Sequence, residues 1–444
     1  MWLLLALLPM LLGARPCPSG ECAKEHLLLQ HRHDVHKVAT NHQAVVNRKA
    51  SIVEEHGRLG VVGNKVVDQY GQPIRLRGMS LFWSQWKPQF WTQGAVQWLK
   101  EDWGITLLRC PMAIEMGGYL ADPSAERAKI EVVVDAAIAA GIYVIVDWHD
   151  HNAEQEEHVT AAKEFFAEMS EKYGSVPNVM FEIFNEPIYQ VWNETIKPYH
   201  ETIIPVIRQH SQNLIILGTR FWSQDVDGAA GDPCEGDNLA YTVHFYANTH
   251  KQELRDKVAK ALEAGVAIFA TEWGTCDASG DGTLNLEETK QWLDFFAEHN
   301  ISDANWAVSD KEEACSALLP GALGTGQWQD CELTLSGHFV RASLRGEALP
   351  ATLPAPCPRL TTPPPGMCAT KEEDCSEKKC CEDLGSTCFQ KNEYWASCKT
   401  SCTPGIDPLD DPSWATPWTC EVLTRDEEPN TTTTTSSETE HSVP

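Results

Sequence analysis

Two glutamates in this sequence stand at the ends of short apolar segments, where a buried strand would present a polar side chain. Glu186 follows "VMFEIFN" at residues 179–185, and Glu272 follows "AIFAT" at residues 267–271. Two carboxyl groups on either side of a sugar ring can cleave a glycosidic bond, because one protonates the leaving oxygen while the other attacks or activates water. The two acids therefore predict glycosidic cleavage, provided that the fold brings them together.

The segment after Glu272 also fits a second interpretation. Residues 277–288 match five positions of a twelve-residue calcium-binding loop: Asp277, Ser279, Asp281, Gly282 and Glu288. Such a loop needs a helix on both sides, and here the preceding segment is predicted to be a strand. Glu272 therefore favours an active site, and calcium stays an alternative only as a loop stabiliser. We expect no cofactor and no required metal.

Eight short segments rich in Val, Ile and Leu lie between residues 56 and 347 and predict strands: 74–79, 105–110, 143–148, 179–184, 214–219, 240–245, 267–272 and 303–308. Amphipathic stretches such as 126–141 and 156–174 separate most of them. Strands that alternate with helices pair in parallel through right-handed crossovers. Eight such units in about 290 residues match the size of a (β/α)8 TIM barrel, an α/β fold. An open doubly wound sheet is the alternative, although no G-x-G-x-x-G follows the first strand.

Polar and aromatic residues stand at seven of the eight predicted strand ends: Arg109, His149, Asn185 with Glu186, Trp222, His244 with Tyr246, Glu272, and Trp306. In a barrel these ends meet at one mouth, where the active site lies. One such residue alone would be explained as a helix cap or a surface charge, but the whole set predicts a site. Imidazole, phenol and guanidinium groups would keep one acid ionised, while the other must hold its proton near neutral pH. The two tryptophans suit the apolar faces of a pyranose ring, with ordinary barrel packing as the alternative.

These segments resemble glycoside hydrolase family 5, and are most similar to bacterial-type endo-β-1,4-glucanases. "VMFEIFNEP" is similar to the acid/base signature of the family, and "IFATEWGT" to its nucleophile strand. "LLRCP", "VIVDWH", "HFYANTH" and "NWAVSDKEE" follow in the order of the family, so the resemblance covers about residues 56–347. It implies a retaining endo-β-1,4-glucanase that works by double displacement without a cofactor.

The resemblance also implies roles for individual residues. Glu186 would be the acid/base and Glu272 the nucleophile, with Asn185 hydrogen-bonded to the sugar 2-hydroxyl. His244 and Tyr246 would support the site and Arg109 would steady the nucleophile. The expected subsite residues are His149, Trp222, Trp306, Lys311 and Glu313.

One residue departs from the family pattern. Related cellulases commonly have a histidine where this chain has Phe82, close to the expected glucose subsites. The substrate could therefore be another β-1,4-glycan, such as mannan or mixed-linkage glucan. A carbohydrate-binding or wall-structuring protein without activity is the alternative from a different class, and the intact pair of glutamates argues against it.

Charge and cysteine content indicate where the protein works. The net charge of −28, from 35 basic and 63 acidic residues, argues against a nucleic acid or an anionic membrane as partner. Residues 1–14 are predicted to be a signal peptide and residues 15–55 a polar leader or propeptide. Sixteen cysteines fit an oxidising compartment, and Asn193, Asn300 and Asn430 are glycosylation acceptors. We therefore expect a secreted, monomeric glycoprotein that acts on a polysaccharide.

The C-terminal part has a different composition. Residues 348–367 form a Pro-rich linker, residues 368–420 a cysteine-rich module, and residues 421–444 a Thr/Ser-rich tail that is predicted to be disordered. The eight cysteines of the module allow 105 pairings, so their connectivity cannot be read from the sequence. Five aromatic residues of the module either bind carbohydrate or pack around disulfides: Phe389, Tyr394, Trp395, Trp414 and Trp418. In the barrel, Cys276 and Cys315 follow neighbouring strands, so they could form a disulfide.

Overall fold

The structure is a computed structural model that describes residues 50–350, 368–370, 373–381, 386–406, 410 and 415–423. The predicted signal peptide, most of the leader and of the linker, Trp414 and most of the tail lie outside the described residues. Among the helices that are described, none is long and apolar enough to cross a membrane.

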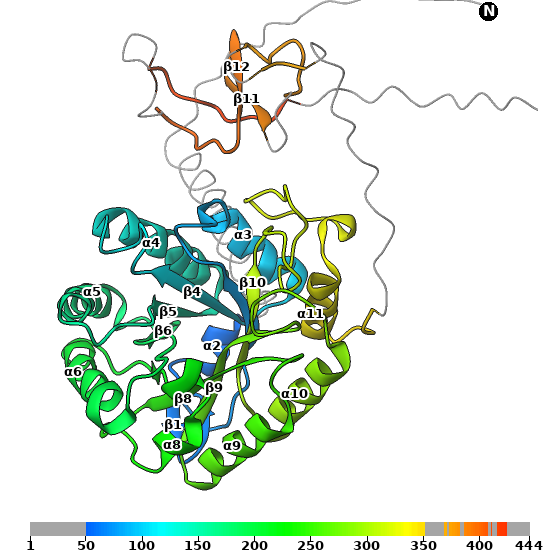
Figure 1. The fold of residues 1–444 in the computed structure, drawn as a ribbon. Helices are drawn as coiled ribbons and strands as arrows, with labels where there is room; N and C mark the ends of the chain where they lie inside the picture. Colours follow the sequence, from blue (N-terminus) through cyan, green and yellow to red (C-terminus); the bar gives the residue numbers. More distant parts are fainter. Residues whose placement is uncertain are drawn as a thin grey trace, which may run out of the picture. The chain divides into compact units, whose positions relative to one another are not determined.

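Eight parallel strands close into a barrel in the order β10-β3-β4-β5-β6-β7-β8-β9 (Figure 1). Their bounds are β3 (Arg77–Leu81), β4 (Leu107–Ala113), β5 (Tyr143–His149), β6 (Val179–Glu182), β7 (Ile215–Leu217), β8 (Leu239–Tyr246), β9 (Ala267–Gly274) and β10 (Asp303–Val308). Each apolar segment identified in the sequence contains most or all of one strand. The predicted (β/α)8 barrel is therefore confirmed, and the open doubly wound sheet is excluded.

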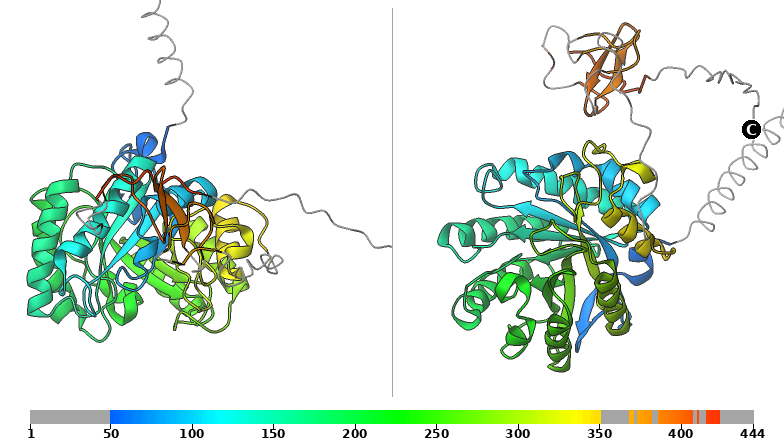
Figure 2. Two further views of the ribbon diagram at one scale, coloured as in Figure 1. Left: turned by 90° about the horizontal axis from the view of Figure 1, so that it is seen from above. Right: turned by 45° about the vertical axis from the view of Figure 1, so that its right-hand side comes forward.

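At least one helix follows each barrel strand and covers the outside of the barrel (Figure 2). These helices are α3 (Gln93–Trp98), α4 (Pro123–Ala140), α5 (Glu156–Tyr173), α6 (Lys197–Arg208), α8 (Val226–Ala230), α9 (Gln252–Glu263), α10 (Leu286–His299) and α11 (Leu335–Arg345). The short element α7 (Arg220–Ser223) contains non-helical residues and is a turn after β7. Short 3₁₀ or π segments are η1 (Pro88–Phe90), η2 (Leu99–Trp103), η3 (Trp192–Ile196) and η4 (Asp330–Glu332).

Local sequence sets the ends of the helices, as α4 illustrates. The side chain of Asp122 accepts a hydrogen bond from the backbone N–H of Ala125, and Pro123 occupies the first helical position, where it needs no donor. The helix ends at Gly141, whose φ of 67° is a left-handed conformation that glycine adopts without strain.

A separate apolar cluster closes the amino end of the barrel. Helix α2 (Ile52–His56) supplies Val53, and the hairpin of β1 (Gly60–Val62) and β2 (Lys65–Val67) supplies Val66, with Leu59 from the connection between helix and hairpin. These side chains belong to the same buried cluster as residues near the starts of the barrel strands, among them Leu107. The two ends of the barrel therefore differ, with an apolar plug at one and polar residues at the other.

The cysteine-rich module is built on an antiparallel hairpin of β11 (Thr387–Asn392) and β12 (Trp395–Lys399). Four disulfides join its eight cysteines: Cys368–Cys380, Cys375–Cys388, Cys381–Cys398 and Cys402–Cys420. Its aromatic residues are of two kinds. Trp418 is buried beneath the ammonium of Lys399, whereas Tyr394 and Trp395 are 79% and 42% exposed at the tip of the hairpin.

Candidate active site

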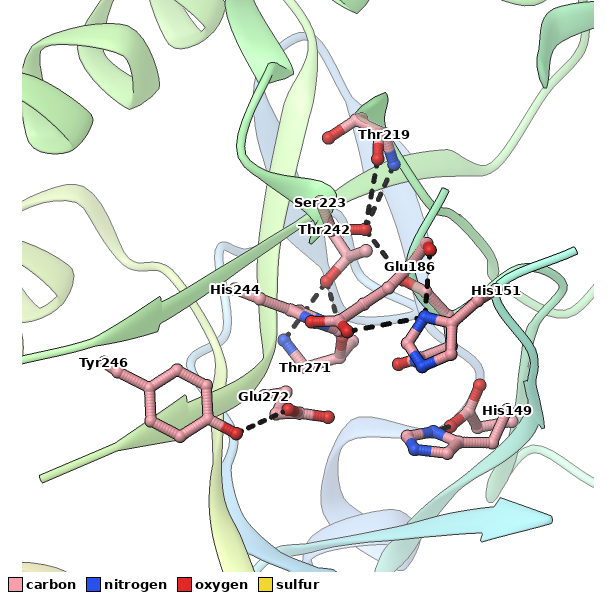
Figure 3. A network of polar contacts seen from close by, with 12 residues as sticks. His149, His151, Glu186, Thr219, Ser223, Thr242, His244, Tyr246, Thr271 and Glu272 are labelled. Carbon is pink, nitrogen blue, oxygen red and sulfur yellow. Dashed lines mark hydrogen bonds and ion pairs between the residues drawn. The ribbon is translucent and has the colours of Figure 1, made fainter. Parts of the chain in front are cut away.

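A cluster of polar side chains fills the carboxyl end of the barrel. Its members are Arg109 on β4, Asp147 and His149 on β5, Glu182 on β6, Asn185 and Glu186 just beyond β6, His244 and Tyr246 on β8, and Thr271 and Glu272 on β9. All of them except Glu186 are buried. Residues two apart on a strand face the same side, which brings His149 with Asp147, and Tyr246 with His244, into one network (Figure 3).

Arg109 is the centre of this cluster. Its guanidinium donates to Glu182 Oε2 at 2.8 Å, to Glu272 Oε2 at 2.8 Å and to Asn185 Oδ1 at 2.7 Å, and it lies 2.9 Å from Asp147 Oδ2. A charge without solvent contact needs such partners, and a planar guanidinium can serve several of them at once. Arg109 therefore holds acids from three strands in fixed positions.

Asn185 is oriented by the same contact. Because its Oδ1 accepts from Arg109, its Nδ2 faces away, and this buried amide nitrogen has no hydrogen-bond partner among the residues that the structure describes. A buried donor without a partner is costly, and such exceptions concentrate at functional sites. Asn185 therefore presents a free donor beside the two glutamates.

Glu272 has a donor on each carboxylate oxygen. Tyr246 Oη donates to Oε1 at 2.8 Å, and Arg109 Nη1 donates to Oε2 at 2.8 Å. Hydrogen bonds of this kind stabilise the charged form of a carboxylate. These two contacts therefore orient the Glu272 carboxylate and favour its charged form, against burial and the charge of Glu186, which raise its pKa.

Glu186 is held by imidazole groups instead. His244 Nδ1 lies 2.8 Å from Oε1, and His151 Nδ1 lies 3.8 Å from Oε2 (Figure 3). The hydroxyl of Thr271 donates to Glu182, so it accepts from His244 Nε2 at 2.9 Å. With Nε2 fixed as a donor, the bond between His244 and Glu186 carries one proton, on either Nδ1 or Oε1.

Burial acts to raise the pKa of both glutamates, but their neighbours give the two residues opposite net shifts. At Glu186 the hydrogen bond and the charge of His244 outweigh burial and lower the pKa. At Glu272 burial, together with the charge of Glu186, outweighs His244 and Arg109 and raises the pKa. Burial lowers the pKa of His244, but the charge of Glu272 and the hydrogen bonds to Glu182 and Glu186 raise it to about 9. Without a sugar in the site, the shared proton therefore rests on His244.

The two glutamates face a common space. One carboxylate oxygen of Glu186, one of Glu272 and a ring nitrogen of His244 all lie within 4.8 Å of one another. They border a cavity of about 500 Å³ that is lined by Glu186, Trp222, Gln224, His244, Tyr246, His250, Glu272, Ala278 and Ser279. The same three groups are close enough to hold a metal ion, but an ion would have to displace the hydrogen bond between His244 and Glu186.

The other predicted site residues lie on two sides of the glutamates. His149 donates to Asp147 at 2.7 Å and stacks on Trp306, with ring centroids 5.4 Å apart. Burial and the charge of Arg109 lower the pKa of His149, so its ring is neutral. Lys311 and Glu313 form an ion pair beyond β10, on the same side as Trp306. Trp222 stands on the opposite side, after β7.

Phe82 takes the place of the expected histidine with an apolar contact. Its ring lies 5.1 Å from that of Trp306, and the ammonium of Lys311 lies 5.5 Å from its centroid. The histidine of the family pattern could form hydrogen bonds here, whereas the ring of Phe82 cannot. The departure therefore changes the lining of the site beside Trp306 and leaves the pair of glutamates unchanged.

The alternative calcium loop is organised by protein contacts. Asp277 accepts from Asn248 and from the backbone of Thr283, and Asp281 accepts from the backbone of Ala314. Glu288 lies on α10 and forms an ion pair with Arg255. The side chains of the loop therefore have separate partners. Nearby, Cys276 and Cys315 form the expected disulfide, with Cα atoms 5.6 Å apart.

Four residues of the network were not identified in the sequence: Asp147, His151, Glu182 and Thr271. Asp147 and Glu182 lie inside "YVIVDWH" and "VMFE", and an acid within a fully buried apolar strand is itself unusual. That signal could have identified both. Thr271 and His151 carried no comparable signal, because hydroxyl and imidazole groups are common near strand ends.

Comparison with known proteins agrees with this geometry. Residues 67–312 match the family Cellulase (glycosyl hydrolase family 5). An endoglucanase of Clostridium saccharobutylicum is 46% identical over 68% of this chain and 68% of its own length. Endoglucanase A of Evansella cellulosilytica is 46% identical over 67% of this chain and 62% of its own length. The chain thus spans roughly two thirds of the length of these relatives.

Solved structures show the same likeness. A structure from Cytophaga hutchinsonii is 50% identical, with a TM-score of 0.66 over 66% of this chain and 96% of that one. The catalytic domain of Thermobifida fusca endoglucanase Cel5A is 34% identical, with a TM-score of 0.64 over 67% of this chain and 100% of that domain. This chain belongs to the cellulase family, glycosyl hydrolase family 5, and is a glycoside hydrolase.

Proposed function

We propose that this protein is a secreted, retaining endo-β-1,4-glucanase that hydrolyses internal glucosidic bonds by double displacement. The observation that carries the proposal is the short distance between the two acids, with carboxylate oxygens of Glu186 and Glu272 within 4.8 Å of each other. Retaining glycosidases have carboxyl groups about 5–5.5 Å apart, whereas inverting enzymes keep about 6.5–9.5 Å to admit a water. Relatives named endoglucanases support the choice of substrate.

In the first step Glu272 attacks the anomeric carbon and the glycosidic bond breaks. The leaving oxygen takes its proton from Glu186, and the sugar stays bound to Glu272 as an ester. In the second step the Glu186 carboxylate removes a proton from water, and the resulting hydroxide displaces Glu272. Both glutamates end in their starting states, so the cycle needs no cofactor.

The proton for the first step is stored on the pair of His244 and Glu186. It rests on His244 before a sugar binds, and a shift along the hydrogen bond from Nδ1 to Oε1, whose atoms are 2.8 Å apart, makes Glu186 a neutral acid. A sugar in the cavity excludes water and disfavours the separated charges, which drives this transfer. The negative charge on Glu272 is then held by Arg109 and Tyr246.

The remaining residues bind the sugar. Asn185 has its Nδ2 free to donate to the 2-hydroxyl, because Arg109 occupies its Oδ1. His149 and Trp306 form a stacked pair suited to the glycone. Since Phe82 replaces a hydrogen-bonding ring, another β-1,4-glycan such as mannan or mixed-linkage glucan is the second candidate substrate.

Secretion is supported by the disulfides in both described parts of the chain: Cys276–Cys315 in the barrel domain, and the four that join the cysteines of the module. We propose that the enzyme acts as a monomer, because both acids and all their partners come from one chain.

The test is cleavage of soluble glucans by the purified chain, with product anomers followed by NMR. We expect the β-anomer to form first. Glu186→Ala should lose most activity on natural glucan, because the leaving oxygen no longer receives a proton. On an aryl β-cellobioside, whose leaving group departs without a proton, azide should raise the turnover of this variant by giving a β-glycosyl azide, since azide attacks the intermediate without a general base. Initial formation of the α-anomer would reject the retaining mechanism, and absence of cleavage would reject the enzyme proposal. Higher activity on mannan than on glucan would favour the second substrate.

A further inference from the structure

The turn after β7 has an unusual backbone. Phe221, Trp222 and Ser223 all have positive φ, of 56°, 53° and 54°. Residues with a side chain avoid this left-handed region because Cβ approaches a carbonyl oxygen, and three in succession are rare. Such strain persists only where the surroundings impose it, so the turn must be held by specific contacts.

Those contacts run to the segment that carries Glu186. Ser223 Oγ donates to the carbonyl of Asn185 at 2.7 Å, and Asn185 is next to Glu186 in the chain. The backbone N–H of Trp222 donates to Pro187 O at 3.0 Å, and that of Phe221 donates to Ile188 O at 3.2 Å. The turn and residues 185–190 therefore form one unit, and a shift of either would move the other.

Two of the aromatic rings that this unit exposes to solvent lie next to each other, those of Trp222 and Tyr189. Trp222 is 39% exposed and lines the cavity of the glutamates, and Tyr189 is 74% exposed further along the same segment. Their ring centroids are 5.8 Å apart and their planes meet at 73°. The rings thus make two walls of a corner, which fits a single sugar chain better than the flat face of a crystal.

The order of the strands tells which part of the substrate meets this corner. Glu186 and Tyr189 follow β6 and Trp222 follows β7, while Glu272 lies on β9 and Trp306 on the next strand, β10. A chain that passes both acids therefore runs from the β10 side to the side of β6 and β7. Glu186 protonates the leaving oxygen, so the leaving sugars must extend over its own segment.

We propose that Tyr189 forms an outer sugar-binding subsite for the leaving group, adjoining Trp222 and taking a pyranose unit beyond the one next to the scissile bond. The ligand is a single β-1,4-glucan chain in solution. The phenol ring supplies an apolar face for the C–H groups of the sugar, as aromatic rings do in binding sites with one dry and one wet side. This inference rests on the proposed function of the same site.

The test compares Tyr189→Ala with the full-length wild-type chain on cellohexaose and on a chromogenic aryl β-cellobioside. The aryl leaving group occupies the space next to Glu186 and is too short to reach Tyr189. We expect kcat/KM on cellohexaose to fall about 3- to 10-fold, the range of one aromatic contact, with cleavage moving toward shorter leaving groups. Activity on the aryl substrate should stay unchanged, and Tyr189→Phe should behave like the wild type.

Tyr70→Ala is the matched control, because Tyr70 is 69% exposed and lies among the residues that follow β2. Equal kinetics of Tyr189→Ala and wild type on cellohexaose would overturn the inference. An equal loss on both substrates would also overturn it, since Tyr189 would then support the turn and bind no sugar. A wild-type chain that cleaves neither substrate would reject the proposed function and this inference with it.

Discussion

His244 and Glu186 share one proton across the 2.8 Å between Nδ1 and Oε1. The opposite side of the imidazole donates to Thr271 at 2.9 Å, so the ring cannot turn to use its other nitrogen. In the proposed mechanism the general acid is therefore this pair of residues, and the acid is lost when the pair gives up its shared proton. The pH dependence of activity should therefore follow the pKa of the pair of His244 and Glu186 more closely than the pKa of an isolated glutamate.

The first prediction concerns the alkaline side of the activity profile. Since the pKa of His244 is raised to about 9, kcat/KM should fall as the pH rises through about 9. His244→Asn leaves Glu186 as the only proton carrier, so the alkaline fall should move to lower pH and the maximum rate should drop. Initial rates on soluble glucan between pH 5 and 10 test this, and an unchanged alkaline limb in the variant would contradict it.

The same shift affects stability. The pKa of His244 in the folded protein lies above its ordinary value of 6.5, so the folded protein binds this proton more tightly than the unfolded chain does. This stabilisation is present in full below about pH 6.5 and is lost as the pH rises through about 9. The Tm of the wild type should therefore fall more steeply across that pH window than the Tm of His244→Asn. Parallel curves would show that His244 does not contribute.

The second prediction concerns the proposed nucleophile, Glu272. Glu272→Gln keeps an oxygen for Tyr246 or Arg109 but cannot form the ester, so turnover should drop by more than about a thousandfold with little change in Tm. The control is Glu168→Gln, because Glu168 is half exposed on α5, outside the site. Retention of a tenth of the activity in Glu272→Gln would assign the nucleophile elsewhere.

The third prediction concerns Phe82. Phe82→His would put a hydrogen-bonding ring beside Trp306, at the point where related cellulases commonly carry one, and would remove the contact with the Lys311 ammonium. The ratio of kcat/KM on cellotetraose to that on mannotetraose should rise, by up to about tenfold for one hydrogen bond. Phe82→Leu, which only shortens the apolar contact, is the control. The same ratio in both variants would show that this position does not set glycan preference.

The barrel and the two acids of the proposed mechanism were predictable because each carries a local signal. Eight apolar segments of strand length identify the sheet, and Glu186 and Glu272 break the apolar pattern at strand ends. The left-handed turn at Phe221–Ser223 could not be predicted, because residues other than glycine rarely adopt positive φ and the sequence does not indicate where they do. Tyr189 carried no signal of its own either. Disulfide pairing in the module needed the fold, since eight cysteines fit many connectivities. The burial of Trp418 and the exposure of Tyr394 likewise depend on the hairpin.

The fourth prediction concerns the barrel disulfide. Cys276–Cys315 ties the segments after β9 and β10 together, beside Tyr246 and Trp306 in one buried cluster. A crosslink over 39 residues contributes about 4 kcal/mol by loop closure, so Cys276→Ser with Cys315→Ser should lower Tm by roughly 10 °C. Cys234→Ala is the control, because Cys234 is buried without a disulfide. Equal melting of the double variant and the wild type would exclude a stabilising role.

The last prediction separates the barrel from the module. All eight strands and the whole site lie before residue 348, so a chain truncated there should fold and cleave soluble glucan at the wild-type rate. If the module holds insoluble polymer, truncation should lower activity on crystalline cellulose alone, because tethering raises the local concentration of enzyme at a surface and a dissolved chain does not need it.

Point variants identify the surface. Tyr394→Ala with Trp395→Ala removes the two exposed rings at the tip of the hairpin and should reproduce the loss on crystalline cellulose in the full-length chain. Trp418→Phe, a conservative change beneath Lys399, should leave binding intact because Trp418 faces inward. Loss on soluble glucan as well would mean that the module supports the barrel. No loss on either substrate would mean that these aromatic residues serve the disulfide-bonded module alone.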